Sequence, residues 1–408
     1  MKKAILITRS FPYSDACEDS FILPELPYLC AEFDEVIIIP ERITGCACDI
    51  AMFGNVFVNT SYAMFLGSNR IGSLMIAAIE YIPVLLREIS KNERRMTFEI
   101  IGSVIRAWLA AVKRSIWLKK YCRNEKGTVY YTYWFDGSTL ALAFLGIRPL
   151  VTRAHGYDLF EERHNNGIIP FRKYALGELT KLFLVSEAGL DYITGRYPEY
   201  SEKYILAPIG CVDHGLGMGP SIDGIIRIVS CAYVVSIKRI DLILDSMKAL
   251  ALTTPGIRVI WTHIGDGELY SDLQNKAKDD TEGLEIHLLG KLETDDVLRY
   301  YRVNHVDLFI HLSLTEGGRP ISIAEAISYG IPVVACDAGG VRELVSSENG
   351  RLLPVSVDSA TVAEACLSII RSERYLDMCN ASRQKWNEFA NANDNMRIFS
   401  KLLSSIYS

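Results

Sequence analysis

Two glutamates around a glycine turn are the residues of this chain whose types and spacing best suit a phosphate-containing ligand. Glu316 and the glycine pair 317–318 come directly after a short apolar run, residues 306–312. Pro320 suits the first position of a helix, so the free N–H groups of the next turn would lie beside this glycine turn. Free amides at the positive end of a helix dipole favour an anion such as a diphosphate. Glu325, a few residues into the helix, can accept paired hydrogen bonds from a ribose diol.

Three basic residues are candidates for neutralising that diphosphate. Lys238 and Arg239 follow an apolar run that ends near Tyr233, and they precede a helix predicted over 241–250. Cations at such a position can stabilise a departing diphosphate, although paired basic residues before a helix are also commonly solvated. Arg319, in the turn beside Glu316, is a further candidate cation.

The first half of the chain has its own candidates. His155 follows an apolar strand, and its imidazole can donate a hydrogen bond to a sugar hydroxyl or a phosphate; the structural alternative is a buried histidine bonded to backbone. Asp158 can orient an acceptor hydroxyl or His155, or it can cap a helix. After the first strand, residues 12–21 contain no glycine, so Glu18 or Ser20 would have to contact an acceptor through their side chains.

Composition excludes several classes of function. The formal charge of −6 over 408 residues argues against a dedicated nucleic-acid binder. The ten cysteines form no Cys-x-x-Cys pair, which indicates reduced thiols and a cytoplasmic protein rather than a zinc site or disulfides. No Asp-x-Asp, Walker loop or His-Glu-x-x-His is present, so we predict no metal site and no cofactor.

Short apolar runs alternate with helical segments from end to end, a pattern typical of βαβ units and parallel sheets. A dense glycine and proline cluster at 208–220 indicates an interdomain linker. The predicted strands lie near 4–8, 36–40, 129–133, 150–153 and 182–186, and, after the linker, near 227–231, 258–264, 285–289, 306–312 and 332–336.

The second half resembles family 4 glycosyltransferases, which are retaining enzymes of the GT-B fold. Two departures stand out: Glu316 and Glu325 enclose eight residues where the family usually has seven, and Tyr233 stands where the family commonly has an arginine. The segments that carry the resemblance are Glu325-Ala326, Gly330-Ile331-Pro332-Val333-Val334, Gly339-Gly340 with Glu343, and Asn349-Gly350.

The resemblance implies two Rossmann-like domains with parallel sheets facing across a cleft. We expect an acceptor-side domain at 1–208, a nucleotide-sugar-binding domain at 209–385, and a C-terminal helix at 386–408 that packs back on the first domain. The expected catalytic residues are His155, Lys238 and Glu316, and the expected donor-binding residues are Arg239, Gly317, Gly318, Arg319 and Glu325.

The implied reaction moves a sugar, with retained configuration, from a UDP- or GDP-sugar to a hydroxyl of a saccharide or lipid-linked saccharide in envelope polysaccharide biosynthesis. Two alternatives remain open. A GT-B nucleotide-sugar epimerase would change the donor without an acceptor. A catalytically silent nucleotide-binding subunit would release no nucleotide at all.

Positive charge is concentrated in residues 87–126, which hold eleven Lys/Arg and four Asp/Glu, a net charge of +7. A helix predicted over 101–121 places Arg106, Lys113 and Lys120 on one face, with Trp117 close by. Such a basic helix can lie on an anionic membrane surface, and the alternative is a solvated helix that packs its apolar stripe on the sheet. Glu80, Pro83, Arg87 and Glu88 interrupt the apolar run at 71–89, so we predict no membrane span there.

Overall fold

The computed structural model describes residues 1–13, 18–68, 71–91 and 97–406, and the chain divides into two compact units. The first unit comprises Met1–Ala207 and Asp394–Ser408, and the second comprises Pro208–Asn393. The second unit therefore extends beyond residue 385, where the sequence analysis ended it. The reason is that helix α14 (Tyr375–Phe389) continues through Trp386, whose ring is buried in the second unit and donates a hydrogen bond to Cys211 Sγ at 3.1 Å.

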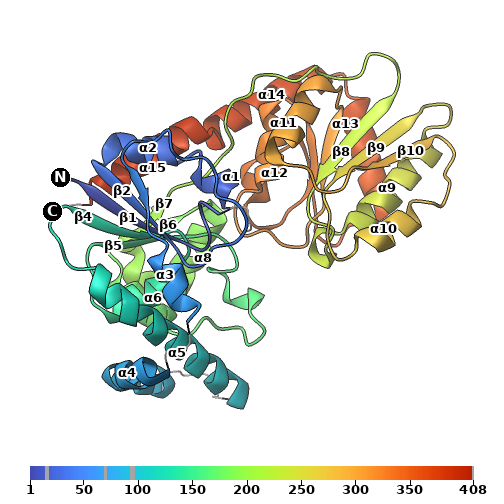
Figure 1. Cartoon of the computed structure of the whole chain (residues 1–408). Helices are drawn as coiled ribbons and strands as arrows, with labels where there is room; N and C mark the ends of the chain where they lie inside the picture. Colours follow the sequence, from blue (N-terminus) through green and yellow to red (C-terminus); the bar gives the residue numbers. More distant parts are fainter. Residues whose placement is uncertain (14–17, 69–70, 92–96, 407–408) are drawn as a thin grey trace. The chain divides into compact units, whose positions relative to one another are not determined.

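The first unit is built on a seven-stranded parallel sheet with strand order β3-β2-β1-β4-β5-β6-β7 (Figure 1). The central strands are nearly continuous apolar runs, as expected for strands buried on both faces. The strands are β1 (Lys3–Thr8), β2 (Glu35–Pro40), β3 (Val56–Val58), β4 (Thr128–Thr132), β5 (Leu150–Ala154), β6 (Lys181–Leu184) and β7 (Tyr204–Leu206).

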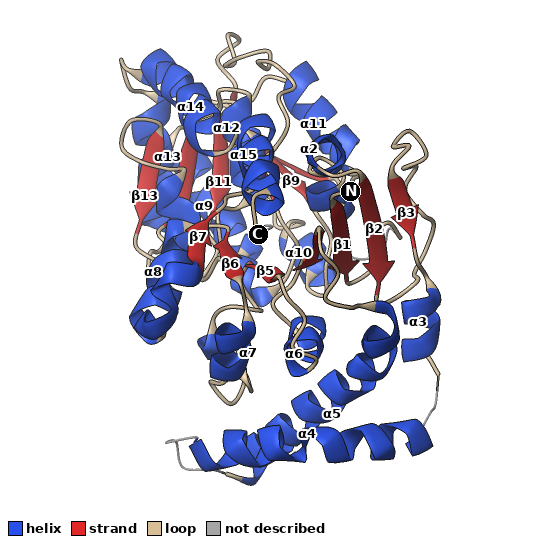
Figure 2. Ribbon diagram, turned by 90° about the vertical axis from the view of Figure 1, so that its left-hand side faces the viewer, coloured by secondary structure: helices blue, strands red, loops and turns tan. Residues whose placement is uncertain are grey.

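Helices cover the first sheet, as the ribbon in Figure 2 shows. They are α1 (Asp19–Ile22), α2 (Leu26–Glu32), α3 (Ser61–Leu66), α4 (Ile71–Lys91), α5 (Phe98–Tyr121), α6 (Gly137–Phe144), α7 (Arg172–Glu178), α8 (Glu187–Arg196) and α15 (Ala392–Ser404), most of which belongs to this unit.

The second unit repeats the plan with a six-stranded parallel sheet of order β10-β9-β8-β11-β12-β13. Its strands are β8 (Ile226–Cys231), β9 (Val259–Ile264), β10 (Leu284–Leu288), β11 (Leu308–His311), β12 (Val333–Cys336) and β13 (Gly350–Leu353). Its helices are α9 (Ile240–Thr253), α10 (Tyr270–Lys276), α11 (Thr294–Val303), α12 (Ile321–Ser328), α13 (Ser359–Ile370) and α14.

All ten predicted strands are present, and the expectation of two parallel-sheet Rossmann-like units is confirmed. The three strands that the sequence did not predict are β3, β7 and β13, and each is an outermost strand of its sheet. Outermost strands are short and pair on one side only, so they lack the long apolar run that marks a central strand.

The C-terminal helix α15 is part of the first unit's core. Phe399 is fully buried there and packs against the rings of Tyr131 and Phe183. The guanidinium carbon of Arg153, at the end of β5, lies 3.9 Å from the Phe399 ring centroid, and Arg153 forms a fully buried ion pair of 2.5 Å with Glu25. This arrangement links the chain terminus to the strand that precedes His155.

Helix α5 packs its apolar stripe on the core of the first unit, which is the alternative considered for residues 101–121, and docking of its basic face on a membrane stays a prediction. Val104, Trp108, Val112 and Leu118 are buried in the first unit's core. Its cations are also partly committed, because Lys113 donates a hydrogen bond to a main-chain carbonyl of α3. No helix in the described ranges is long and apolar enough to cross a membrane.

Candidate active site

In the second unit, Lys238 and Glu316 meet at the carboxyl ends of strands β8 and β11. Lys238 lies in the turn between β8 and α9, and its Nζ forms an ion pair with Glu316 Oε1. His311, the last residue of β11, places its Nε2 2.8 Å from the same carboxylate oxygen and 3.0 Å from Ser313 Oγ. Ligands of parallel α/β sheets bind at this edge of the sheet.

The electrostatics of this cluster favour an ionised glutamate. Burial alone would raise the pKa of Glu316, but the hydrogen bond and charge of His311 and the charge of Lys238 outweigh it and hold this pKa far below its usual range. Burial lowers the pKa of His311 in spite of the neighbouring carboxylate. The sequence analysis missed His311, although its position at the end of the strand before Glu316 is a signal that could have identified it.

The glycines of this region serve close backbone packing. A Cβ at Gly339 would lie 2.1 Å from the carbonyl oxygen of Glu316, and a Cβ at Gly340 would lie 2.6 Å from the carbonyl carbon of Gly318. Gly339 also has a positive φ of 57°. The second glycine pair therefore allows the loop after β12 to support the Glu316 turn, which includes Gly317.

Glu325 lies on the first turns of α12 without a partner. Its side chain makes no hydrogen bond or ion pair with any residue that the structure describes, and burial raises its pKa to about 7. The intrahelical hydrogen bonds of α12 begin with Ala324 N donating to Pro320 O at 3.1 Å, so the amides before Ala324 precede the ladder. Free amides and a carboxylate without a partner are suited to a phosphate and a diol, respectively.

Arg239 and Arg319 do not contribute to this cluster as the sequence suggested. Arg239 has a left-handed backbone, and its three guanidinium nitrogens donate to the carbonyls of Leu312 and Val355 and to Cys336 Sγ. Arg319 is buried, pairs with Glu343 at 2.7 Å, and donates to the Phe389 carbonyl at 2.6 Å. Both arginines join loops of the second unit in this structure, and their predicted binding of donor phosphates stays a prediction.

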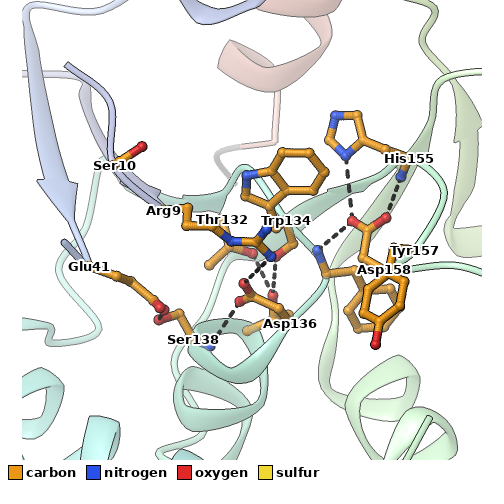
Figure 3. A network of polar contacts seen from close by, with 12 residues as sticks. Arg9, Ser10, Glu41, Thr132, Trp134, Asp136, Ser138, His155, Tyr157 and Asp158 are labelled. Carbon is orange, nitrogen blue, oxygen red and sulfur yellow. Dashed lines mark hydrogen bonds and ion pairs between the residues drawn. The ribbon is translucent and has the colours of Figure 1, made fainter. Parts of the chain in front are cut away.

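In the first unit, Asp158 organises the loop that carries His155 (Figure 3). One carboxylate oxygen accepts hydrogen bonds from the amides of His155 (2.8 Å) and Gly156 (3.0 Å). The other accepts from the Phe135 amide at 3.0 Å and lies 3.4 Å from His155 Nδ1. Of the roles considered from sequence, orienting His155 is the one that this geometry matches.

The charge of Asp158 and the orientation of His155 depend on each other. Burial would raise the pKa of Asp158, but His155 and the surrounding amides lower it to about 2. The His155 ring lies between Tyr133 and Trp134, with centroids at 4.9 and 4.3 Å. Its Nε2 is buried and has no hydrogen-bond partner among the described residues, so it is the atom left for a ligand.

Glu18 has a structural role, and the acceptor contact considered for it from sequence stays a prediction. Its carboxylate accepts hydrogen bonds from the amides of Arg9, Ser10 and Phe11, at 2.6–2.9 Å, and from the Trp134 indole. These bonds hold the loop after β1. Within the same predicted acceptor segment, Ser20 lies in α1 and is partly exposed, and residues 14–17 lie outside the described residues.

The structure adds Arg9 and Asp136 to the candidates, because they follow the neighbouring strands β1 and β4. Arg9 Nη2 lies 3.8 Å from Asp136 Oδ2, and its guanidinium lies 5.0 Å from the Trp134 ring centroid (Figure 3). Arg9 remains 36% exposed. Strands were predicted at both places, so the residues that follow their carboxyl ends were a signal for this pair, and the structure shows that the two strands are adjacent.

The buried ion pair between Arg114 and Glu41 lies close to Asp136. Arg114 of α5 binds Glu41 through two hydrogen bonds of 3.0 and 2.8 Å, and Ser138 also donates to Glu41. Burial, followed by the charge of Glu41, raises the pKa of Asp136 to about 7. Asp136 also caps helix α6 by accepting from the Ser138 amide at 3.1 Å. The group next to Arg9 is therefore a carboxyl that changes charge near neutral pH.

Comparison with known proteins gives matches in sequence and in fold. Residues 226–372 match the family described as Glycosyl transferases group 1. A curated relative, the amylovoran biosynthesis glycosyltransferase AmsK of Erwinia amylovora, is 27% identical over 154 residues, which cover 36% of this chain and 37% of that protein. The match thus spans little more than a third of the relative's length.

Solved structures match over nearly the whole chain. The lipopolysaccharide outer core galactosyltransferase WaaB aligns with a TM-score of 0.65 and 14% identity, over 98% of this chain and 99% of that one. TarM of S. aureus aligns with a TM-score of 0.65 and 11% identity, over 99% and 100%. The chain therefore has the GT-B fold of two Rossmann-like units, and residues 226–372 of its second unit match the glycosyl transferases group 1 family.

Proposed function

We propose that this protein is a retaining glycosyltransferase that moves a sugar from a nucleotide diphosphate sugar to a hydroxyl of a saccharide or lipid-linked saccharide. The observation that carries the proposal is the polar cluster Lys238–Glu316–His311 at the carboxyl end of the second sheet, in the unit that contains the unpartnered carboxylate of Glu325. The AmsK match favours polysaccharide biosynthesis as the setting.

On the donor side, each group has a distinct task. Lys238 exchanges its ion pair with Glu316 for the diphosphate, where negative charge develops as the glycosidic bond breaks. Glu316 is then free to accept hydrogen bonds from the hydroxyls of the donor sugar. Glu325 accepts the ribose hydroxyls, because two hydroxyl donors would satisfy a carboxylate that otherwise has no partner in the described residues.

Metal independence follows as part of the same proposal. An ammonium group and helix amides can stabilise a leaving diphosphate without a Lewis acid. The nucleotide sugar is then a substrate, and no cofactor is required.

In the first unit, we assign His155 Nε2 to a hydroxyl or phosphate oxygen, and Arg9 with Asp136 to the acceptor. Front-face attack accounts for retention: the acceptor oxygen bonds to the anomeric carbon as the bond to the diphosphate breaks, and the leaving phosphate takes the acceptor's proton. Water exclusion around the bound donor favours transfer over hydrolysis.

The donor nucleotide is proposed as UDP, with GDP as the alternative. Solved neighbours have been crystallised in complex with UDP, among them TarM of S. aureus and the pneumococcal O-GlcNAc transferase GtfA. The chain spans 60% of the length of GtfA. For this reason we do not propose the acceptor of GtfA as the acceptor of this chain.

The proposal is tested by incubating the purified protein with UDP-, GDP- and ADP-sugars, with and without lipid-linked saccharide acceptors. We expect acceptor-dependent release of one nucleoside diphosphate and a product with the anomeric configuration of the donor, read by NMR. A changed sugar without nucleotide release indicates an epimerase. Absence of turnover, with nucleotide binding retained, indicates a silent subunit. Either outcome would overturn the proposal.

A further inference from the structure

Helix α4 has an outward face that nothing in the described structure covers. It is the outermost helix of the first unit in Figures 1 and 2, with α5 beside it. The side chains on this face are aliphatic and between 40% and 75% exposed: Met75, Ile76, Ile79, Ile82 and Leu86. At 3.6 residues per turn, the five positions fall within an arc of about 120°. Soluble proteins seldom expose such a contiguous apolar stripe without a partner.

Residues on the inner face of α4 hold this helix against the rest of the first unit. Tyr81 is buried, its ring stacks on Phe144 at 5.0 Å, and its carbonyl accepts the Trp108 indole hydrogen at 3.0 Å. Glu88, further along α4, accepts a hydrogen bond from the Phe171 amide at 2.7 Å. These contacts keep the inner side of the helix on the unit, and the aliphatic face is left outside.

The charges near this face indicate which kind of partner it fits. Along one edge of the stripe lie Arg87, which is exposed, and Glu80, whose charge is matched by Lys119 at 2.9 Å. Lys120 and Arg106 of α5 are also exposed, and residues 87–126 as a whole carry eleven basic and four acidic residues, a net charge of +7. An apolar stripe on a helix next to a segment of high net positive charge is the pattern of a helix that lies in the interface of an anionic bilayer.

A second copy of the chain fits this face less well. A symmetric dimer places the same patch of both copies together. The net charge of +7 on residues 87–126 would then be brought close to the same charge of the other copy.

We propose that the outward face of α4 docks the protein on an anionic membrane surface, with its aliphatic side chains in the acyl boundary and the cations at the headgroups. This places the apolar part of the membrane contact on α4, and residues 101–121 contribute cations to it. A surface helix of this kind would keep the enzyme beside a lipid-linked acceptor, but the docking itself does not depend on the identity of the reaction.

The test is co-sedimentation of the full chain with vesicles of phosphatidylcholine and with vesicles that contain about one third phosphatidylglycerol. We expect binding to the anionic vesicles that weakens as salt rises. The variant Ile76→Glu/Ile79→Glu should bind at least about tenfold more weakly. Leu376→Glu is the matched control: Leu376 is 64% exposed on α14 of the second unit, so this variant should bind as the wild type does.

A second variant tests the electrostatic part. Arg87→Gln/Lys120→Gln should weaken binding to anionic vesicles, by about fivefold for each cation that lies at the headgroups, and leave binding to phosphatidylcholine unchanged. Circular dichroism and nucleotide release with a soluble acceptor should be unaffected in all variants, which separates failure of docking from failure of folding or of the proposed reaction.

Two outcomes would overturn the docking proposal. One is that Ile76→Glu/Ile79→Glu sediments with anionic vesicles as well as the wild type does. The other is that the wild type is a dimer without vesicles and the same variant is a monomer, which would make this face an interface between copies.

Discussion

Lys238 and Glu316 form an ion pair, at side-chain exposures of 19% and 13%, between loops that are 78 residues apart in sequence. His311 shares the same carboxylate oxygen. The ion pair holds the Lys238 side chain in place before a donor arrives, and the diphosphate can compete for Lys238 because the diphosphate and the Glu316 carboxylate are both anions. The first prediction follows from this exchange.

Replacement of Lys238 should impair the chemical step. We expect Lys238→Ala to lower kcat by about 10²–10³-fold, the usual cost of removing a group that stabilises developing negative charge. Lys238→Arg should recover part of the rate. Lys248→Ala is the control, because Lys248 pairs with Asp279 on the other side of α9 and should not affect turnover. Unchanged steady-state kinetics in Lys238→Ala would exclude the phosphate-binding role.

Glu325 should make stability depend on pH. Its pKa is about 7 in the folded protein against an ordinary 4.5, so the folded state binds the proton more tightly than the unfolded state. The associated stability is present below pH 4.5 and is lost as pH rises through about 7. Glu325→Gln should remove this dependence and gain roughly 1–3 kcal/mol over the wild type above neutral pH, by urea unfolding. Glu348 is exposed, so Glu348→Gln should show the same dependence of unfolding free energy on pH as the wild type does. The same pH dependence in both variants would contradict the assignment of this pKa to Glu325.

Gly339→Ala should displace the Glu316 turn. The new Cβ would meet the Glu316 carbonyl oxygen at 2.1 Å, in a backbone with positive φ. We expect a loss of more than about 2 kcal/mol in unfolding free energy and weaker nucleotide binding by calorimetry. Gly146→Ala provides the matched control, since Gly146 has a similar φ of 62° but no atom within 4 Å of its Cβ. It should cost only the backbone strain, about 1–2 kcal/mol, with nucleotide affinity intact.

Asp158→Ala should loosen the His155 loop. Three buried amides, those of His155, Gly156 and Phe135, would lose their acceptor. We expect a loss of about 1–3 kcal/mol at neutral pH by chemical denaturation, together with a lower kcat. Asp394→Ala, at an exposed ion pair, should change neither quantity appreciably. A fully active Asp158→Ala would show that His155 does not need this support.

Arg9→Ala should affect the acceptor and spare the donor. Arg9 is the partly exposed cation beside Asp136 and Trp134, so its loss should raise the acceptor KM by about tenfold while the nucleotide Kd stays constant. Arg42→Ala, two residues beyond β2 in the same unit, is the control. A change in the nucleotide Kd, without a change in the acceptor KM, would show that Arg9 binds the donor rather than the acceptor.

The sequence alone predicted the elements and part of the candidate site. Apolar runs marked the nine inner strands and the outermost strand β10, because a parallel strand covered on both faces is apolar along most of its length. A strand end followed by a glycine turn and a helix start predicted where Glu316 and Glu325 lie. These are local signals, so they are readable without knowledge of the tertiary structure.

The tertiary structure decided which polar side chains remain available to a ligand. Arg239, Arg319 and Glu18 carry the right charges at the right edge of a sheet, yet carbonyls, a carboxylate and main-chain amides from other segments satisfy them. Asp158, Arg9 and His311 likewise acquire their roles from partners brought together by the fold. A buried polar group must find a partner within its reach, and which partner is within reach depends on how distant segments pack.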